Sequence, residues 1–194
     1  MAASFGDESI FCAIDANGKQ QITYWGINNT SPATNAISGP SLAALTDGGG
    51  FLCGLQANTF RPLCWMDNET GTNLVPLSKQ NMRYSNIASG QNHACGIRSY
   101  LDQYLGMIDC WSMKNTTKQR SLSSSLSPPS NISLQSIVAR DDFTCGLDHD
   151  RIAFCWGSPS PQFNIIAPPP YKFHSLVSGS NHVCGIVKIT SEVK

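Results

Sequence analysis

Eight cysteines are the residues of this 194-residue chain with the clearest capacity for covalent or metal chemistry. Six of them form three recurring pairs, in which the first cysteine precedes a glycine and the second precedes a tryptophan: Cys53 with Cys64, Cys95 with Cys110, and Cys145 with Cys155. Zinc ligands usually stand at short spacings such as C-x2-C, whereas the members of these pairs are 10 to 15 positions apart. We therefore expect three disulfides, with free buried thiols or a metal site as the alternatives.

Histidines and adjacent carboxylates are the other candidates for chemistry. His93 and His182 each stand two positions before a repeat cysteine, but Phe51 and Phe143 hold that place in the sister repeats, which favours a packing role. Asp141-Asp142 replaces glycine or amide residues at a turn. No Gly-x-Ser-x-Gly or HExxH motif accompanies them. We predict no catalytic residue, no metal site and no cofactor, and the sequence identifies no ligand-binding residue.

The elements that position the cysteines are short strands in a repeat. Each pair lies on two segments with period-two alternation, rich in β-branched and aromatic residues, as expected of antiparallel strands. The first cysteine of the unit recurs about every 40 residues, a period typical of β-propeller blades. Its five copies are Cys12, Cys53, Cys95, Cys145 and Cys184. Cys12 and Cys184 have no second cysteine within their repeats.

We therefore predict an all-β fold, a partial, open β-propeller of about four to five blades with intra-blade disulfides. A single domain would cover residues 1–194, with blades at about 1–40, 41–82, 83–133 and 134–172 and an incomplete one at 173–194. The tryptophans should seal blade against blade, because an indole supplies a large apolar surface. The glycine after each first cysteine should let a neighbouring blade approach closely.

Between the third and fourth repeats lies a Ser-rich, Pro-containing insertion at residues 112–133. We predict that it is solvated and dispensable for folding, because its composition buries too little apolar surface to offset the entropy of ordering it.

Charge and composition narrow the class of protein. Charged residues make up 13% of the chain, the net charge is +0, and no basic cluster is present, which argues against nucleic acid and membrane-surface binding. No apolar run reaches the length of a membrane span, and the N-terminus shows no signal peptide. Paired cysteines together with sequons indicate an oxidising, secretory compartment. Because no leader is visible, we expect a chain cut from a longer one or a misplaced start codon. The expected glycosylation sites are Asn28, Asn68, Asn115 and Asn131.

The repeat resembles that of the regulator-of-chromosome-condensation superfamily. SGQNHACGI, which begins at Ser89, and SGSNHVCGI, which begins at Ser178, match its first part, and CWGS at Cys155 and YWG at Tyr24 match its second. The paired CG(I/L) and CW cysteines narrow the resemblance to the extracellular domain of plant Crinkly-type receptor-like serine/threonine kinases. That family implies a seven-bladed propeller followed by a membrane helix and a kinase domain. This chain has fewer repeats and no Gly-rich phosphate loop, VAIK-like lysine, HRD or DFG motif.

The resemblance implies an extracellular recognition module of a receptor-like kinase, which binds a protein or peptide ligand and possesses no enzymatic activity in this chain. Self-association of the receptor is a further implied contact, and the expected location is the extracellular face of the plasma membrane or the secreted fraction. The alternative is a stand-alone scaffold or nucleotide-exchange module of the wider superfamily. Eight reduced thiols in the native protein would favour that alternative.

Overall fold

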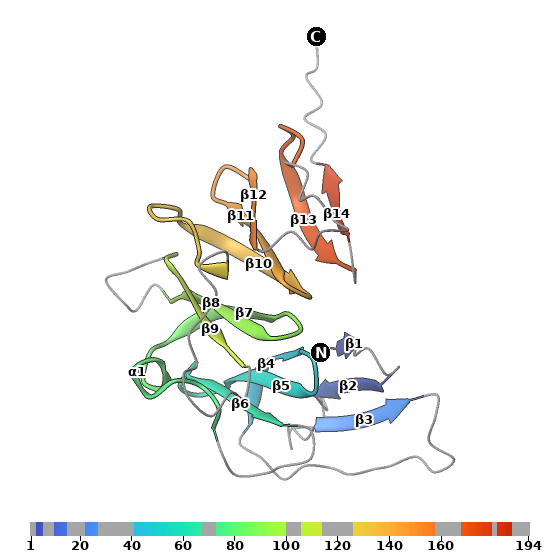
Figure 1. Ribbon diagram of the computed structural model, residues 1–194, viewed down its shortest axis with the longest axis vertical. Helices are drawn as coiled ribbons and strands as arrows, with labels where there is room; N and C mark the ends of the chain where they lie inside the picture. Colours follow the sequence, from blue (N-terminus) through green and yellow to red (C-terminus); the bar gives the residue numbers. More distant parts are fainter. Residues whose placement is uncertain are drawn as a thin grey trace.

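Five small antiparallel sheets, which we call blades 1 to 5, follow one another round an open arc (Figure 1). The computed structural model describes residues 41–66, 73–99, 106–113, 126–157, 168–179 and 182–187, together with the backbone of the three strands of blade 1. Blade 1 consists of β1 (Ala3–Phe5), β2 (Ile10–Ile14) and β3 (Ile22–Gly26). The predicted all-β, open-propeller fold is confirmed.

Blades 2 to 4 each have three strands, and blade 5 has two among the described residues. The strands are β4 (Leu42–Asp47), β5 (Phe51–Gln56) and β6 (Pro62–Met66); β7 (Tyr84–Ser89), β8 (His93–Arg98) and β9 (Ile108–Ser112); β10 (Leu134–Arg140), β11 (Phe143–Asp148) and β12 (Ala153–Gly157); and β13 (Phe173–Ser178) and β14 (Val183–Val187). A single helical turn, α1 (Leu77–Gln80), precedes blade 3. The first strands of consecutive blades contact one another, so they line the inside of the arc.

The three predicted cysteine pairs are disulfides. Within each blade the two cysteines stand directly opposite each other on the second and third strands, for example Cys95 opposite Cys110. Directly opposite residues point to the same face of a sheet, which brings the two sulfur atoms together. The same register holds for Cys53 with Cys64 and for Cys145 with Cys155.

The disulfides of blades 2 and 3 pack against the next blade along the chain. Cys53 and Cys64 of blade 2 share a buried cluster with Tyr84 and Trp111 of blade 3. Cys95 of blade 3 lies in the equivalent cluster with blade 4, which contains Trp156. Trp111 and Trp156 therefore seal blade against blade, as their recurrence predicted, and much of the core lies between sheets. Among the described residues, the cluster around Trp65 contains residues of blade 2 alone.

The glycine after each first cysteine has a different role from the one predicted. A Cβ atom built on Gly96 would lie 2.5 Å from Cδ1 of Tyr84, which belongs to the same blade. In blade 4, Leu134 lies over Gly146 in the same way. The interpretation that a neighbouring blade fills this space is wrong, because the first strand folds its opening side chain across the glycine of the second. That opening side chain is Leu42, Tyr84, Leu134 or Phe173.

Two sets of backbone hydrogen bonds join consecutive blades, one set at each end of the propeller. At one end the N–H of Tyr84 donates to the carbonyl of Phe60 at 2.9 Å, and the N–H groups that open β10 and β13 repeat this bond to Gly106 and Arg151. All three acceptor residues have positive φ angles, 56°, 74° and 69°. At the other end the N–H of Gln91 donates to the carbonyl of Asp141 at 2.9 Å.

The expectation that residues 112–133 form a wholly solvated loop is wrong at both ends of the segment. Ser112 closes β9 and is buried, and Leu126 is 6% exposed. Ile132 packs against the cluster between blades 3 and 4. Residues 114–125 lie outside the described part of the chain. The ends are ordered because they adjoin strands whose inner face is a blade interface.

Candidate functional site

Of the residues considered for chemistry, His93 is buried in the core and six cysteines form three disulfides. Among the described residues, no group of three or more His, Cys, Asp or Glu is placed to hold a metal ion. Cys184 is a free, exposed cysteine on β14. Cys12 belongs to β2, where Tyr24 stands opposite it in the strand register.

His93 is a buried link between blades 3 and 4. Its Nε2 atom forms a 2.8 Å hydrogen bond with Oγ1 of Thr144, and its ring lies over Gly90. Desolvation by burial is the main influence on the ring and lowers the pKa of His93 to about 4, against the opposing effects of the Asp142 charge and of a hydrogen bond to the backbone of Asp141. The imidazole is therefore neutral near pH 7, and its exposed fraction of 0% leaves no room for a substrate.

The remaining predicted positions lie on turns or outside the described residues. Asp141 sits at a turn with φ 42°, close to Nε of Arg140 at 3.8 Å, and His182 is exposed before β14. Asn131 is exposed on the turn before β10, a position that fits a glycan acceptor sterically. The other three sequons, Asn28, Asn68 and Asn115, fall outside the described part of the chain, and glycosylation stays a prediction at all four.

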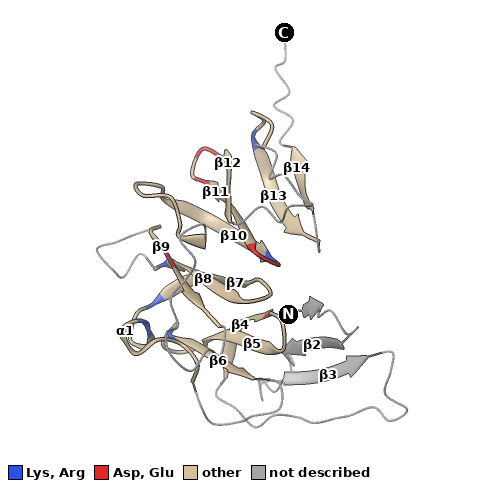
Figure 2. Ribbon diagram, viewed as in Figure 1, with Lys and Arg blue, Asp and Glu red and all other residues tan. Residues whose placement is uncertain are grey.

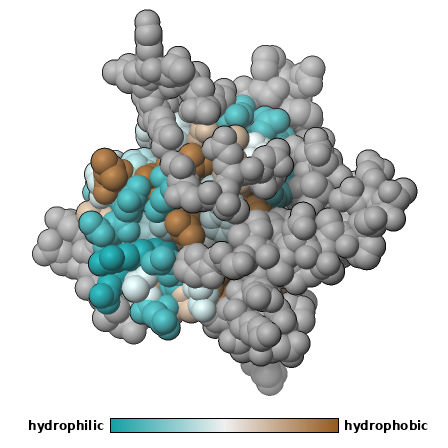
Figure 3. Space-filling view, turned by 90° about the horizontal axis from the view of Figure 1, so that it is seen from below, coloured by the Kyte–Doolittle hydropathy of each residue, from teal (hydrophilic) through white to brown (hydrophobic). Residues whose placement is uncertain are grey.

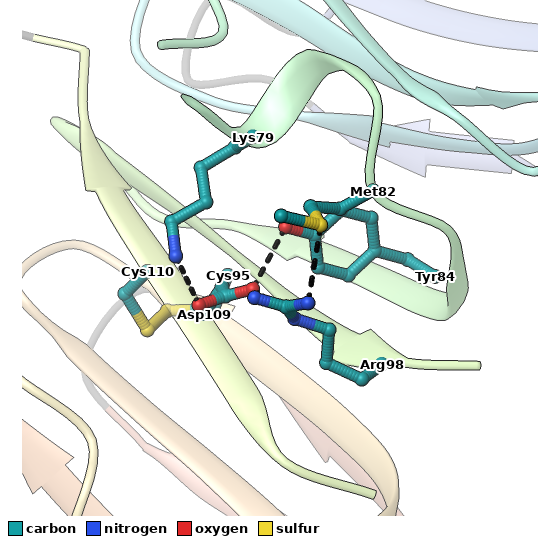
Figure 4. A network of polar contacts seen from close by, with 7 residues as sticks. All are labelled: Lys79, Met82, Tyr84, Cys95, Arg98, Asp109 and Cys110. Carbon is teal, nitrogen blue, oxygen red and sulfur yellow. Dashed lines mark hydrogen bonds and ion pairs between the residues drawn. A yellow bond between two sulfur atoms is a disulfide. The ribbon is translucent and has the colours of Figure 1, made fainter. Parts of the chain in front are cut away.

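A polar network that the sequence analysis missed lies at the opposite end from the Asp141 turn. Asp109 accepts hydrogen bonds from Lys79 of α1, from Arg98 and, at 2.9 Å, from the Tyr84 hydroxyl (Figure 4). Burial raises the pKa of Asp109, but Lys79, Arg98 and Tyr84 outweigh it, so the pKa lies below its usual value. No motif could have revealed these partners, because they come from four separate segments.

We define the hairpin face as the end of the propeller where the second and third strands of each blade join. It includes the turn from Ala57 to Arg61, the residues that flank the β8–β9 connection, and the turn from His149 to Ile152. The opposite end, where the first and second strands join, we call the tip face, and Gly49, Gln91 and Asp141 mark it. Backbone hydrogen bonds fix the blades to one another at both faces, so each face presents its side chains from a rigid frame.

Comparison with known proteins gives a consistent assignment. The chain is 37% identical over 206 residues to the serine/threonine-protein kinase-like protein CCR2 of Arabidopsis thaliana, a match that covers 100% of this chain and 26% of that protein. The ectodomain of the receptor kinase CR4 of Physcomitrella patens superimposes with a TM-score of 0.72 at 28% identity, over 96% of this chain and 50% of the solved one. The chain is similar to Crinkly-type ectodomains.

A second Crinkly-type structure supports the assignment. The ectodomain of the receptor kinase ACR4 of Arabidopsis thaliana matches with a TM-score of 0.68 and 25% identity, over 95% of this chain and 58% of the solved one. No protein-family model matches. The chain thus spans about a quarter of the curated relative, half of the CR4 ectodomain and 58% of the ACR4 ectodomain.

The Crinkly-type likeness concerns an ectodomain fold and not an enzymatic one. The three disulfides of blades 2, 3 and 4 fit the oxidising setting of an ectodomain. Within the described residues, no helix has the length and apolar character needed to span a membrane.

Proposed function

We propose that this chain is an extracellular recognition module of a receptor-like serine/threonine kinase and that it binds a protein or peptide ligand. The observation that carries the proposal is the combination of a Crinkly-type fold with a disulfide in each of blades 2, 3 and 4. Interaction sites are commonly built from loops on a rigid scaffold, and both faces of these blades consist of such loops. This chain would lie at the extracellular face of the plasma membrane. The kinase activity would belong to a separate domain of a longer parent protein.

The alternative of an intracellular scaffold or nucleotide-exchange module is less well supported. It requires reduced thiols, whereas six cysteines of this chain are closed into disulfides. We infer that the native protein exposes the propeller to the cell exterior, where it meets a secreted ligand or a second receptor.

Binding by the folded chain tests the proposal. The chain is secreted from a eukaryotic host, immobilised with its disulfides intact, and exposed to a displayed library of random peptides. We expect individual peptides with saturable binding that disappears when the same protein is reduced and unfolded. Equal binding to folded and unfolded protein, or no saturable binder at millimolar peptide, would overturn the proposal. Protease sensitivity of an epitope tag on intact cells checks the location.

A further inference from the structure

Positive charge is concentrated on the hairpin face. The described residues contain seven Lys and Arg, and six of them lie at or beside this face: Arg61, Lys79, Arg83, Arg98, Arg151 and Lys172. The exception, Arg140, ends β10 at the tip face, where its Nε lies 3.8 Å from Oδ1 of Asp141. Figure 2 shows basic and acidic residues next to each other at the end of β10. The net charge of the whole chain, +0, does not reveal how the described basic and acidic residues divide between the hairpin face and the tip face.

Within the described part of the chain, the acidic residues do not cancel the charge of the hairpin face. Asp109 is already shared between Lys79 and Arg98, and Oδ1 of Asp148 accepts the N–H of Ile152 at 2.8 Å. Asp150 is exposed on the same turn. The other three described carboxylates, Asp47, Asp141 and Asp142, lie at the tip face. Arg61 and Arg83 are exposed, and their side chains are the cations best placed to meet a ligand.

Large apolar side chains are exposed on the same face. The described residues include eight exposed large hydrophobic side chains, and five of them belong to this face: Phe60 at 41%, Leu77 at 83%, Met107 at 49%, Ile152 at 42% and Tyr171 at 57%. The other three lie on blade 5. Figure 3 shows the side of the molecule seen from below Figure 1, where hydrophobic side chains are set among hydrophilic ones over the coloured part. Exposed apolar groups rimmed by charge are typical of interaction sites.

The basic and apolar residues of the hairpin face lie close together because the same inter-blade hydrogen bond recurs along the chain. Phe60, Met107 and Ile152 lie at or next to the residue whose carbonyl accepts the inter-blade hydrogen bond. That bond holds the hairpin of each blade beside the opening of the next first strand, which brings Arg83 to the hairpin of blade 2. Three blades thus present the same juxtaposition of apolar and polar side chains, in series along the arc.

We propose that the hairpin face binds an acidic peptide segment that carries large apolar side chains. The exposed arginines match carboxylates, and the apolar residues between them match Leu or Phe side chains that water solvates poorly. An acidic polysaccharide would meet the arginines but leave the apolar residues uncovered. The inference rests on the proposed function and names the surface and the ligand class for it.

The experiment uses the full secreted chain and a labelled ten-residue probe in which Glu alternates with Leu and Phe. A Gln-for-Glu version of the probe and polygalacturonate are tested in parallel. The double variant Arg61→Gln/Arg83→Gln removes two positive charges from the hairpin face. Its matched control, Gln91→Glu/Asn92→Asp, changes the net charge equally at the tip face. Phe60→Asn removes an apolar group and keeps a residue that tolerates positive φ.

We expect saturable binding of the Glu probe that weakens as salt is raised. Affinity should fall at least fivefold in Arg61→Gln/Arg83→Gln and in Phe60→Asn, and less than twofold in the control. Equal losses in both double variants, equal binding of the Gln probe, stronger binding of polygalacturonate, or no binding would overturn the inference. If library peptides still bind in that case, the proposed function stands and only the surface assignment fails.

Discussion

The Nε2 atom of His93 on β8 lies 2.8 Å from Oγ1 of Thr144 on β11, so a buried hydrogen bond joins two consecutive blades. Two sister repeats fill the His93 position with phenylalanine, Phe51 and Phe143, which packs but cannot form such a bond. This contact gives blades 3 and 4 a polar link that responds to pH.

We predict that acid weakens the fold through His93. Its folded pKa of about 4 lies below the ordinary histidine value of 6.5, so between these pH values the unfolded chain binds a proton that the folded chain does not. Stability is therefore present above pH 6.5 and lost as pH falls, by about 2 to 3 kcal/mol between pH 7.5 and 4.5. Urea unfolding at several pH values measures this. His93→Phe should remove most of the pH dependence, whereas His174→Phe, at an exposed position, should retain it.

Asp109→Asn should destabilise the protein at neutral pH by about 1 to 3 kcal/mol, because Arg98 and Tyr84 lose a charged partner. The folded pKa of Asp109 is lowered, so its contribution to stability is present above pH 3.8 and lost below it. The difference between wild type and variant should accordingly shrink in acid below that pH. Asp150→Asn, at an exposed turn, is the control and should change little; an equal effect in both variants would contradict the prediction.

Loss of one disulfide should be costly, whereas loss of the free thiol should not. Cys95→Ala/Cys110→Ala opens a loop of 15 residues and should lower the free energy of unfolding by about 3 kcal/mol. Cys184→Ala should change it by less than about 0.5 kcal/mol, because Cys184 is exposed. Thermal melts of the two variants measure the contrast. Maleimide should label Cys184 in the folded chain and leave the three disulfides unlabelled.

Gly96→Ala should destabilise blade 3 by about 1 to 3 kcal/mol, because the new methyl group would overlap the Tyr84 ring. Gly50→Asn is the control: nothing lies within 4 Å of a Cβ there, and Asn tolerates its φ of 77°. Denaturant midpoints compare the two. A Gly96→Ala protein as stable as the Gly50 variant would show that the Tyr84 ring can move aside.

Replacement of residues 114–125 by a short Gly-Ser linker should leave the melting temperature nearly unchanged, since this stretch is poor in apolar residues. Leu126→Ala, just beyond it, should cost about 2 to 4 kcal/mol, because Leu126 is 6% exposed. If the linker variant no longer unfolds cooperatively, the replaced stretch must pack against the blades.

The sequence alone determined the blades, their strand pairing and their disulfides. Alternation fixes which residues share a face, and the recurrence of Cys-Gly and Cys-Trp fixes which strands are neighbours. The pairing of Cys95 with Cys110 could be predicted from the sequence, because register is a local property of two adjoining strands.

Only the tertiary structure decided which side chains contact one another within and between the blades. Tyr84 covers Gly96, His93 reaches Thr144, and Asp109 collects Lys79 and Arg98, although none of these partners stands at a spacing that a motif records. The separation of charge between the hairpin and tip faces likewise arises from the arc. This charge separation depends on which hairpins lie together at one end of the propeller. Packing between the sheets produces the curvature that brings those hairpins together.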